Sequence, residues 1–237
     1  MALLPDTATR RVAPELMDDP TLAREPHRSA LRGLARINAV SRSAAAIWSV
    51  LCKQLGKRHV GPFRVLDIAC GGGDVAVALQ RLALRAGIVL QVDGCDLSDT
   101  ALSLAKRNAE RRSLEMTFFR LDAIAGSLPH GYDAMISNLF LHHLSHDDAV
   151  LLLTKMSEAA PALVVNDLAR GRFGYAAAVV GTRLLSRSPI VHTDGPRSVR
   201  AAFTLDEARL LAQRAALEHA RVEPAFPYRW RMDWCRA

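Results

Sequence analysis

Several features that would point to particular classes of protein are missing from this sequence. No run of 18 residues is both apolar and uncharged, so no membrane-spanning helix and no membrane partner are expected. The four cysteines, at positions 52, 70, 95 and 235, lack the paired spacing of a metal site, so we expect reduced thiols and no bound metal. Repeats and low-complexity segments are absent, and residues 1–6 show no signal-peptide pattern. We therefore expect a cytoplasmic globular protein.

Lysine is scarce, although the chain is basic. Only four lysines occur among 31 basic residues, and the formal net charge is +7. The arginines are spread along the chain, and their denser groups, Arg197 with Arg200 and Arg229 with Arg231, lack the accompanying motifs of an RNA-binding module. We therefore expect a basic surface and no nucleic-acid partner. An anionic or phenolic substrate would suit that surface as well.

The most informative segment is a glycine-rich turn between an apolar strand and a helix. Residues 65–68 form a short apolar run that contains Asp67, three glycines follow from Gly71 to Gly73, and residues 75–84 are apolar and helix-forming. Consecutive glycines let the backbone turn sharply and let a ligand approach it closely. The helix presents free N–H groups to a polar ligand, and Asp67 lies where open α/β sheets bind ligands. This unit predicts a nucleotide-binding α/β fold.

Two classes of cofactor fit this turn. The spacing Gly71-x-Gly73-x-x-Ala76 satisfies the fingerprint of NAD-binding proteins. The strand predicted over residues 88–96 ends in Asp96, 23 residues past Gly73, near the spacing at which NAD-binding proteins place a carboxylate on the ribose. A third predicted strand also ends in an acid, Asp122. An NAD-binding protein does not require this third acid.

The spacing Asp67-x-x-x-Gly71-x-Gly73 resembles motif I of the class I S-adenosylmethionine (SAM) methyltransferases. The acid–leucine pair at 96–97, followed by a helix with Ser98 at its N-cap, is similar to the ribose-binding motif of that family. Residues 141–144, Leu-His-His-Leu, resemble the segment after the family's fourth strand. The resemblance covers roughly residues 61–235 and is strongest between 65 and 143.

The resemblance implies positions that bind SAM and its product, S-adenosylhomocysteine. Asp67 and the glycine turn would hold the methionine end, Asp96 the ribose hydroxyls and Leu97 the adenine face. Asp122 would face the adenine amino group, and the backbone of Ala123 a ring nitrogen. The full predicted cofactor set is Asp67, Ala69, Cys70, Gly71, Gly73, Asp96, Leu97, Asp122, Ala123 and Asn138.

The implied fold is a Rossmann-like, doubly wound, seven-stranded α/β sheet with a C-terminal antiparallel hairpin and N-terminal helices. We divide the chain into an N-terminal arm and helical cap (residues 1–60) and a SAM-binding core (61–237), with a lid insertion at about 168–203. Apolar spacing between residues 27 and 55 predicts two helices, which either cover the substrate pocket or only stabilise the sheet. Within the insertion we expect a helix over residues 175–185 and a polar loop over 192–200.

The implied function is methyl transfer from SAM to a small-molecule acceptor such as a phenolic, quinone or polyketide-like metabolite. An oxygen acceptor would call for a histidine as general base. His143 occupies the histidine of the resembled Leu-x-His-Leu segment, so it is favoured over His192 and His142.

Two alternative functions stay open. One is a nucleic-acid or protein methyltransferase, which is disfavoured because residues 137–140 lack the Asn/Asp-Pro-Pro-aromatic sequence common in DNA and protein amine methyltransferases. The other is an NAD-binding or non-catalytic nucleotide-binding protein, which rests on the glycine fingerprint alone. The sequence specifies no oligomeric state.

Overall fold

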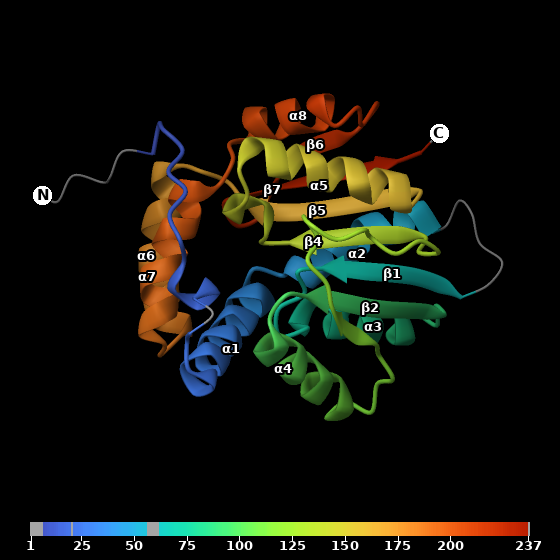
Figure 1. Cartoon of the computed structure of the whole chain (residues 1–237), viewed down its shortest axis with the longest axis horizontal. Coiled ribbons are helices and arrows are strands. Elements are labelled where there is room, and N and C mark those ends of the chain that lie inside the picture. Colours follow the sequence, from blue (N-terminus) through green and yellow to red (C-terminus); the bar gives the residue numbers. More distant parts are fainter. Residues whose placement is uncertain (1–6, 20, 56–61, 237) are drawn as a thin grey trace, which may run out of the picture.

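One mixed β-sheet organises the chain (Figure 1), and the computed structural model describes residues 7–19, 21–55 and 62–236. The strands lie in the order β3-β2-β1-β4-β5-β7-β6. Strands β1 to β5 run parallel, whereas β7 pairs antiparallel with both β5 and β6. This arrangement confirms the predicted Rossmann-like sheet with its C-terminal hairpin. The strand bounds are β1 (Phe63–Ile68), β2 (Leu90–Asp96), β3 (Phe118–Arg120), β4 (Ala134–Asn138), β5 (Ala162–Leu168), β6 (Arg221–Ala225) and β7 (Arg229–Cys235).

The sheet is buried on both faces, so each strand feeds two hydrophobic layers. In β1, Val65 belongs to one core cluster and Leu66 to the other, since successive side chains point to opposite faces. The first face is covered by α2 (Ser43–Leu55), α3 (Asp74–Arg85) and α4 (Asp99–Glu110). The second face is covered by α5 (His146–Ala159) and α8 (Leu205–Arg214). The order of strands reverses between β1 and β4, the point at which such sheets bind ligands.

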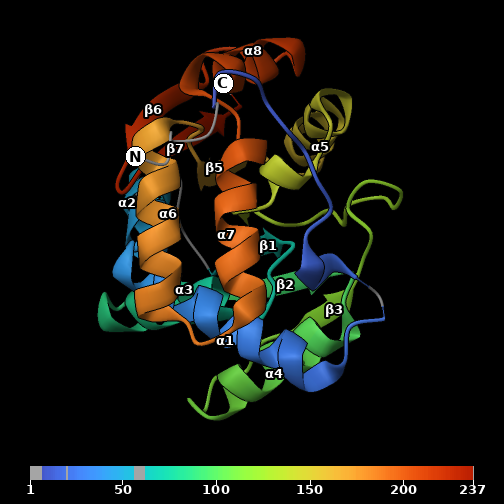
Figure 2. The ribbon, with the colours of Figure 1, turned by 90° about the vertical axis from the view of Figure 1, so that its left-hand side faces the viewer.

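The two predicted N-terminal helices are present, and they have different surroundings. Ile47 and Leu51 of α2 are fully buried in the core against the sheet, so α2 stabilises the fold. Helix α1 (Arg24–Val40) instead lies at the carboxyl ends of the strands, where it contacts α6 (Arg172–Leu185) and α7 (Pro189–Ala201) (Figure 2). The covering and stabilising roles left open by the sequence therefore fall on different helices.

The prediction of a polar loop over residues 192–200 is wrong, because these residues belong to α7. Gly195 lets α7 pack closely on α6, since a Cβ at that position would lie 2.5 Å from Cγ2 of Thr182. Asp194 is buried and accepts hydrogen bonds from two backbone N–H groups of the N-terminal arm, at 3.0 and 3.1 Å. These tertiary contacts outweigh the turn signal of the Gly-Pro pair, although Pro196 supplies no N–H to the helix.

The other element predicted in this insertion is confirmed. Helix α6 spans the predicted residues 175–185 and begins three residues earlier, at Arg172. Together α6 and α7 lie outside the carboxyl edge of the sheet (Figure 1). Among the residues that the structure describes, no helix is long and apolar enough to cross a membrane.

Candidate active site

A cavity of about 1010 Å³ opens at the carboxyl edge of the parallel strands. Its floor is made by the turns that follow β1, β2 and β4, and α1, α6 and α7 contribute to its walls. Figure 2 shows α6 and α7 side by side over this edge, with α1 crossing below them. The cavity is large enough for a nucleoside cofactor together with a second small molecule.

The glycine-rich turn after β1 adopts the backbone conformation that glycine favours. Gly71 and Gly73 have φ angles of +54° and +70°. A Cβ on Gly73 would lie 2.8 Å from Cβ of Ala105, so α4 packs too closely for any side chain there. The N–H of Gly73 donates to the carbonyl of Cys70 at 2.9 Å, which closes the turn. The turn therefore presents its backbone to the cavity at close range.

Two carboxylates flank this turn as the sequence predicted, and a third comes from a residue outside the predicted set. Asp67 is 2% exposed, and its pKa is raised well above the usual range by burial and then by the nearby Asp74 and Asp96. Burial also raises the pKa of Asp74, whose carboxylate accepts a hydrogen bond from Nδ2 of Asn38 at 3.1 Å. Arg229 offsets part of this charge. The result is an acidic pole within the cavity.

Asp96 is held in place by the backbone around it. Its two carboxylate oxygens accept the N–H groups of Gly71 and Ser98, each at 2.8 Å. Burial raises its pKa, although these hydrogen bonds work against the shift. Leu97 beside it is 54% exposed and lines the cavity. A carboxylate and an apolar side chain thus stand next to each other at the end of β2.

The remaining cofactor candidates lie farther along the same edge. Asp122 is exposed, and its carboxylate accepts the N–H groups of Ile124 and Ala125 at 2.9 Å, which lowers its pKa. The side-chain oxygen of Asn138 accepts from Nδ2 of Asn166 at 2.7 Å. Of the ten predicted cofactor residues, all except Gly73 line the cavity: Asp67, Ala69, Cys70, Gly71, Asp96, Leu97, Asp122, Ala123 and Asn138.

His142 is buried between two carboxylates. Its Nδ1 donates to Asp167 at 2.6 Å, and its Nε2 lies 3.6 Å from Glu15. Burial alone would lower the pKa of His142, but Asp167 and Glu15 outweigh it and raise the pKa to about 10. The ring is therefore an imidazolium at neutral pH, so it is not available to take a proton from a substrate.

His143 has a different environment. It lines the cavity, its side chain is 21% exposed, and its Nδ1 lies 3.0 Å from Oδ2 of Asp18. A carboxylate only accepts, so Nδ1 is the donor of this bond, and in the neutral ring Nε2 then carries the free electron pair. The nearest part of Glu15 lies 3.9 Å from Nε2. His143 thus has the tautomer and the exposure that a general base needs.

Glu15, His142 and His143 also present ligand atoms within 4.8 Å of one another. In the part of the chain that the structure describes, this is the only group whose geometry could hold a metal ion. A protonated His142 has no free electron pair for a metal, and its ion pairs with Glu15 and Asp167 account for the arrangement.

The N-terminal arm contributes residues that the sequence analysis did not find. Arg10 donates to the carbonyls of His142 and Leu144 at 3.1 and 2.7 Å, and to that of Ala201 at 2.6 Å. These contacts bring the arm, with Glu15 and Asp18, against the turn that contains His142 and His143, which we call the histidine turn. They join residues more than 120 positions apart, so no local pattern signals them.

His192, the second catalytic candidate, is not brought into this group. It lies on α7, and its Nε2 donates to the carbonyl of Ser186 at 2.7 Å. It is absent from the residues that line the cavity. The geometry therefore favours His143.

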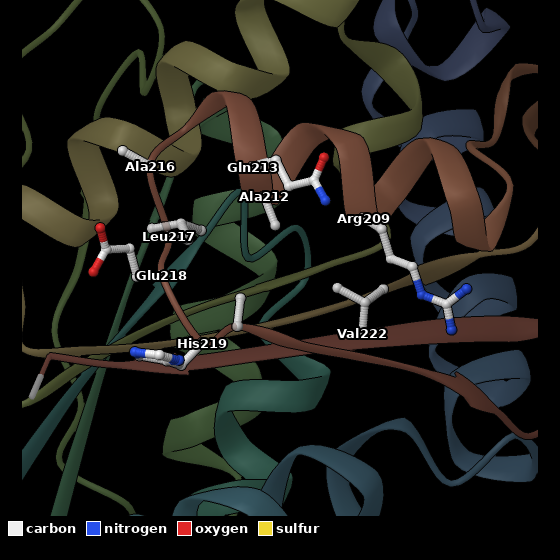
Figure 3. Close-up of a pocket in the computed structure, with 9 residues that line it drawn as sticks. Arg209, Ala212, Gln213, Ala216, Leu217, Glu218, His219 and Val222 are labelled. Carbon is white, nitrogen blue, oxygen red and sulfur yellow. The ribbon is translucent and has the colours of Figure 1, made fainter.

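A second hollow, of about 490 Å³, lies between α8 and the start of β6 (Figure 3). It is lined by Arg209, Ala212, Gln213, Ala216, Leu217, Glu218, His219, Ala220 and Val222. None of the predicted site residues lines it.

Comparison with known proteins supports the family predicted from the motifs. Residues 65–160 match the family model described as a methyltransferase domain. The chain is 34% identical over 129 residues to a demethylmenaquinone methyltransferase of Thermus thermophilus, covering 52% of this chain and 57% of that protein. It is 30% identical over 132 residues to a ubiquinone biosynthesis O-methyltransferase of Burkholderia orbicola, covering 54% of each. The chain therefore spans a little over half the length of these curated relatives.

Solved structures share the fold. A putative O-methyltransferase from Nostoc punctiforme superposes with a TM-score of 0.63 at 17% identity, covering 95% of this chain and 63% of that one. A magnesium protoporphyrin IX methyltransferase from Synechocystis, crystallised with S-adenosylhomocysteine, superposes with a TM-score of 0.58 at 16% identity. The match covers 93% of this chain and 91% of that one.

Proposed function

We propose that this protein is a SAM-dependent methyltransferase that transfers a methyl group from SAM to a small-molecule acceptor. The match of residues 65–160 to the model of a methyltransferase domain supports this proposal. The acceptor would be phenolic, quinone-like or polyketide-like. We also propose the division into a cap (residues 1–60) and a core (61–237) with a lid at about 168–203. A cytoplasmic location stays a prediction.

The observation that carries the proposal is the acidic pole of the cavity. Asp74 and Asp96 lie close enough to Asp67 to raise its pKa, and all three acids raise the pKa of Cys70 between them. Burial and like charge raise the pKa values of these groups, and a bound cation would oppose that shift by stabilising their charged forms. The three carboxyl groups at the glycine turn therefore favour a ligand with positive charge, and SAM carries a sulfonium and an α-amino group. The diphosphate of NAD would instead meet like charge. The pole therefore distinguishes two cofactors that the glycine fingerprint does not.

The chemistry then depends on alignment more than on protein groups. Bound SAM supplies an already electrophilic methyl group. The protein must hold the acceptor in line with the S–CH₃ bond and exclude water. We assign the proton of a hydroxyl acceptor to Nε2 of His143, a residue that lines the cavity in the turn after β4. A carbon acceptor would need no strong base.

The alternative functions have less support. A nucleic-acid or protein acceptor would have to reach a site bordered by the arm, α1, α6 and α7, and the cavity walls are largely apolar side chains such as Leu34, Ile37 and Leu185. An NAD-binding function is disfavoured because the diphosphate of NAD would lie beside the acids of the cavity.

Calorimetric titration tests the cofactor. We expect S-adenosylhomocysteine to bind and NAD to give no comparable heat. Tight binding of NAD without any response to S-adenosylhomocysteine would overturn the proposal.

Asp96→Ala should weaken S-adenosylhomocysteine binding by about 1.5–3 kcal/mol, the scale of a hydrogen bond to a charged group. Asp96 also holds the N–H of Gly71, so circular dichroism should verify that the variant is folded. Glu110→Ala, an exposed acid at the end of the next helix, is the control and should bind as wild type does. Equal affinity of the two variants would show that Asp96 does not bind the cofactor.

The variant Arg10→Ala tests whether the N-terminal arm contributes to turnover. Loss of its three carbonyl contacts should release Glu15 and Asp18 from the histidine turn and lower turnover roughly tenfold, the equivalent of one charged hydrogen bond. Binding of S-adenosylhomocysteine should change little, because Arg10 lies outside the cavity lining. The neighbouring Arg11→Ala is the matched control. An Arg10→Ala enzyme as fast as the control would remove the arm from the mechanism.

A further inference from the structure

The outward side of α6 carries large apolar side chains that nothing in the described chain covers. Phe173, Val180 and Leu184 are 77%, 57% and 79% exposed. They are spaced by seven and four residues, so they share one side of the helix. Figure 2 shows α6 at the molecular surface along its whole length. A helix of a monomeric globular protein normally turns such a side toward the core.

The turn between β6 and β7 extends this apolar surface. Phe226 and Tyr228 of the turn are 75% and 52% exposed. A Cβ placed on Gly174 would lie 3.2 Å from Cβ of Tyr228, so the turn packs directly on the first helical turn of α6. We call these five residues (Phe173, Val180, Leu184, Phe226 and Tyr228) the apolar rim.

The apolar rim borders the cavity. Phe226 and Tyr228 belong to its lining, and so do Gly174, Ala177 and Gly181 of α6. Ala177 is itself exposed and lies between Phe173 and Val180 along the helix. The apolar surface outside the molecule is therefore continuous with the apolar wall of the cavity.

The charged residues on α6 and on the segments that flank it have one sign. Residues 168–193 contain four arginines and no acidic residue. Arg170 is buried in a pair with Glu207, which leaves Arg172, Arg183 and Arg187 exposed on and after α6. A helix with an exposed apolar side and flanking arginines is typical of segments that lie flat in a membrane interface. The absence of a spanning helix does not bear on this mode of binding.

We propose that the apolar rim is a peripheral docking surface for an anionic lipid bilayer. Its apolar side chains would enter the boundary between headgroups and acyl chains, and the three arginines would meet lipid phosphates. A second copy of the chain fits the surface less well, because a symmetric pair would bring the arginines of two α6 helices together, and residues 168–193 contain no acid to balance them. Docked in this way, the cavity opens toward the bilayer, so a lipid-soluble acceptor reaches it without crossing water.

Sedimentation of the 237-residue chain with vesicles tests the proposal without any turnover assay, so its outcome is independent of the proposed function. Vesicles of phosphatidylcholine mixed with phosphatidylglycerol should bind the protein, and pure phosphatidylcholine should bind it less. Raised salt should weaken the binding to the mixed vesicles. Phe173→Ser with Leu184→Ser should lower the partition coefficient about tenfold or more, because two large side chains no longer enter the bilayer.

Matched controls come from exposed leucines elsewhere. Leu84 on α3 and Leu210 on α8 are 59% and 52% exposed, and Leu84→Ser with Leu210→Ser should leave vesicle binding unchanged. Arg183→Gln with Arg187→Gln should remove the preference for anionic lipid. Wild-type protein that stays in the supernatant with mixed vesicles would overturn the proposal, as would equal loss in rim and control variants. Sedimentation equilibrium that shows a dimer, abolished by the rim variant, would assign the surface to a second copy instead.

Discussion

Replacement of His143 by alanine is expected to slow methylation of a hydroxyl acceptor by roughly 100-fold or more, the usual contribution of a general base. The ring lines the cavity, and its Nδ1–H is held by Asp18, so Nε2 is the nitrogen that can take the proton. Binding of S-adenosylhomocysteine should change little, because the ring would face the acceptor. The measurement is steady-state turnover of a phenolic acceptor that the wild-type protein methylates.

The pH profile separates this role from a merely structural one. The defect of His143→Ala should shrink as pH rises toward the pKa of the acceptor, because an acceptor that ionises unaided needs no base. His192→Ala should stay within about twofold of wild type, since its Nε2 is already bonded to the Ser186 carbonyl and general-base effects are far larger than that. A His143→Ala protein with wild-type turnover across the pH range would exclude the role. The reaction would then need no general base from this turn.

Asp167→Ala is expected to cost about 3–5 kcal/mol in the free energy of unfolding, the usual loss when one partner of a buried ion pair is removed. Asp167 is fully buried, and it accepts both the Nδ1–H and the backbone N–H of His142. Without it, His142 keeps only the more distant Glu15 to balance its charge. Chemical denaturation of the variant against wild type measures the loss. Asp147→Ala, which removes an exposed carboxylate paired with Arg214, should have little effect.

The same pair predicts how stability depends on pH. The pKa of His142 is raised to about 10, so its contribution is fully present below its unfolded value of about 6.5 and is lost as pH rises toward 10. The pKa of Asp167 is lowered, so its contribution is present above about 3.9 and is lost as pH falls further. The free energy of unfolding should therefore decline between pH 6.5 and 9 in wild type. In His142→Gln that decline should be flatter, and an identical slope in both proteins would contradict the assignment of the charge to His142.

Local sequence accounts for most of the cofactor half of this site. The glycine turn and the acids Asp67, Asp96 and Asp122 could be recognised because each lies at, or just beyond, the carboxyl end of a strand. Parallel strands bring their carboxyl ends to one edge, so their side chains converge whatever the loops do. Apolar spacing predicted the helices before β1, and the family resemblance implied the C-terminal hairpin.

The remaining parts depended on contacts between distant segments. Asp74 was not recognised because its position in the cavity depends on a hydrogen bond from Asn38 on α1. The helix over residues 192–200 was missed because it is stabilised by packing on Thr182 and by hydrogen bonds from the N-terminal arm. The protonation of His142 follows from its contacts with Asp167 and Glu15, which outweigh the effect of burial and which no local pattern brings together. By itself, the sequence determined the sheet, the turn and the acids, since strand ends and glycines act over a few residues. Only the tertiary structure decided which histidine is charged and which faces the cavity, because burial and ion pairing depend on neighbours from remote parts of the chain.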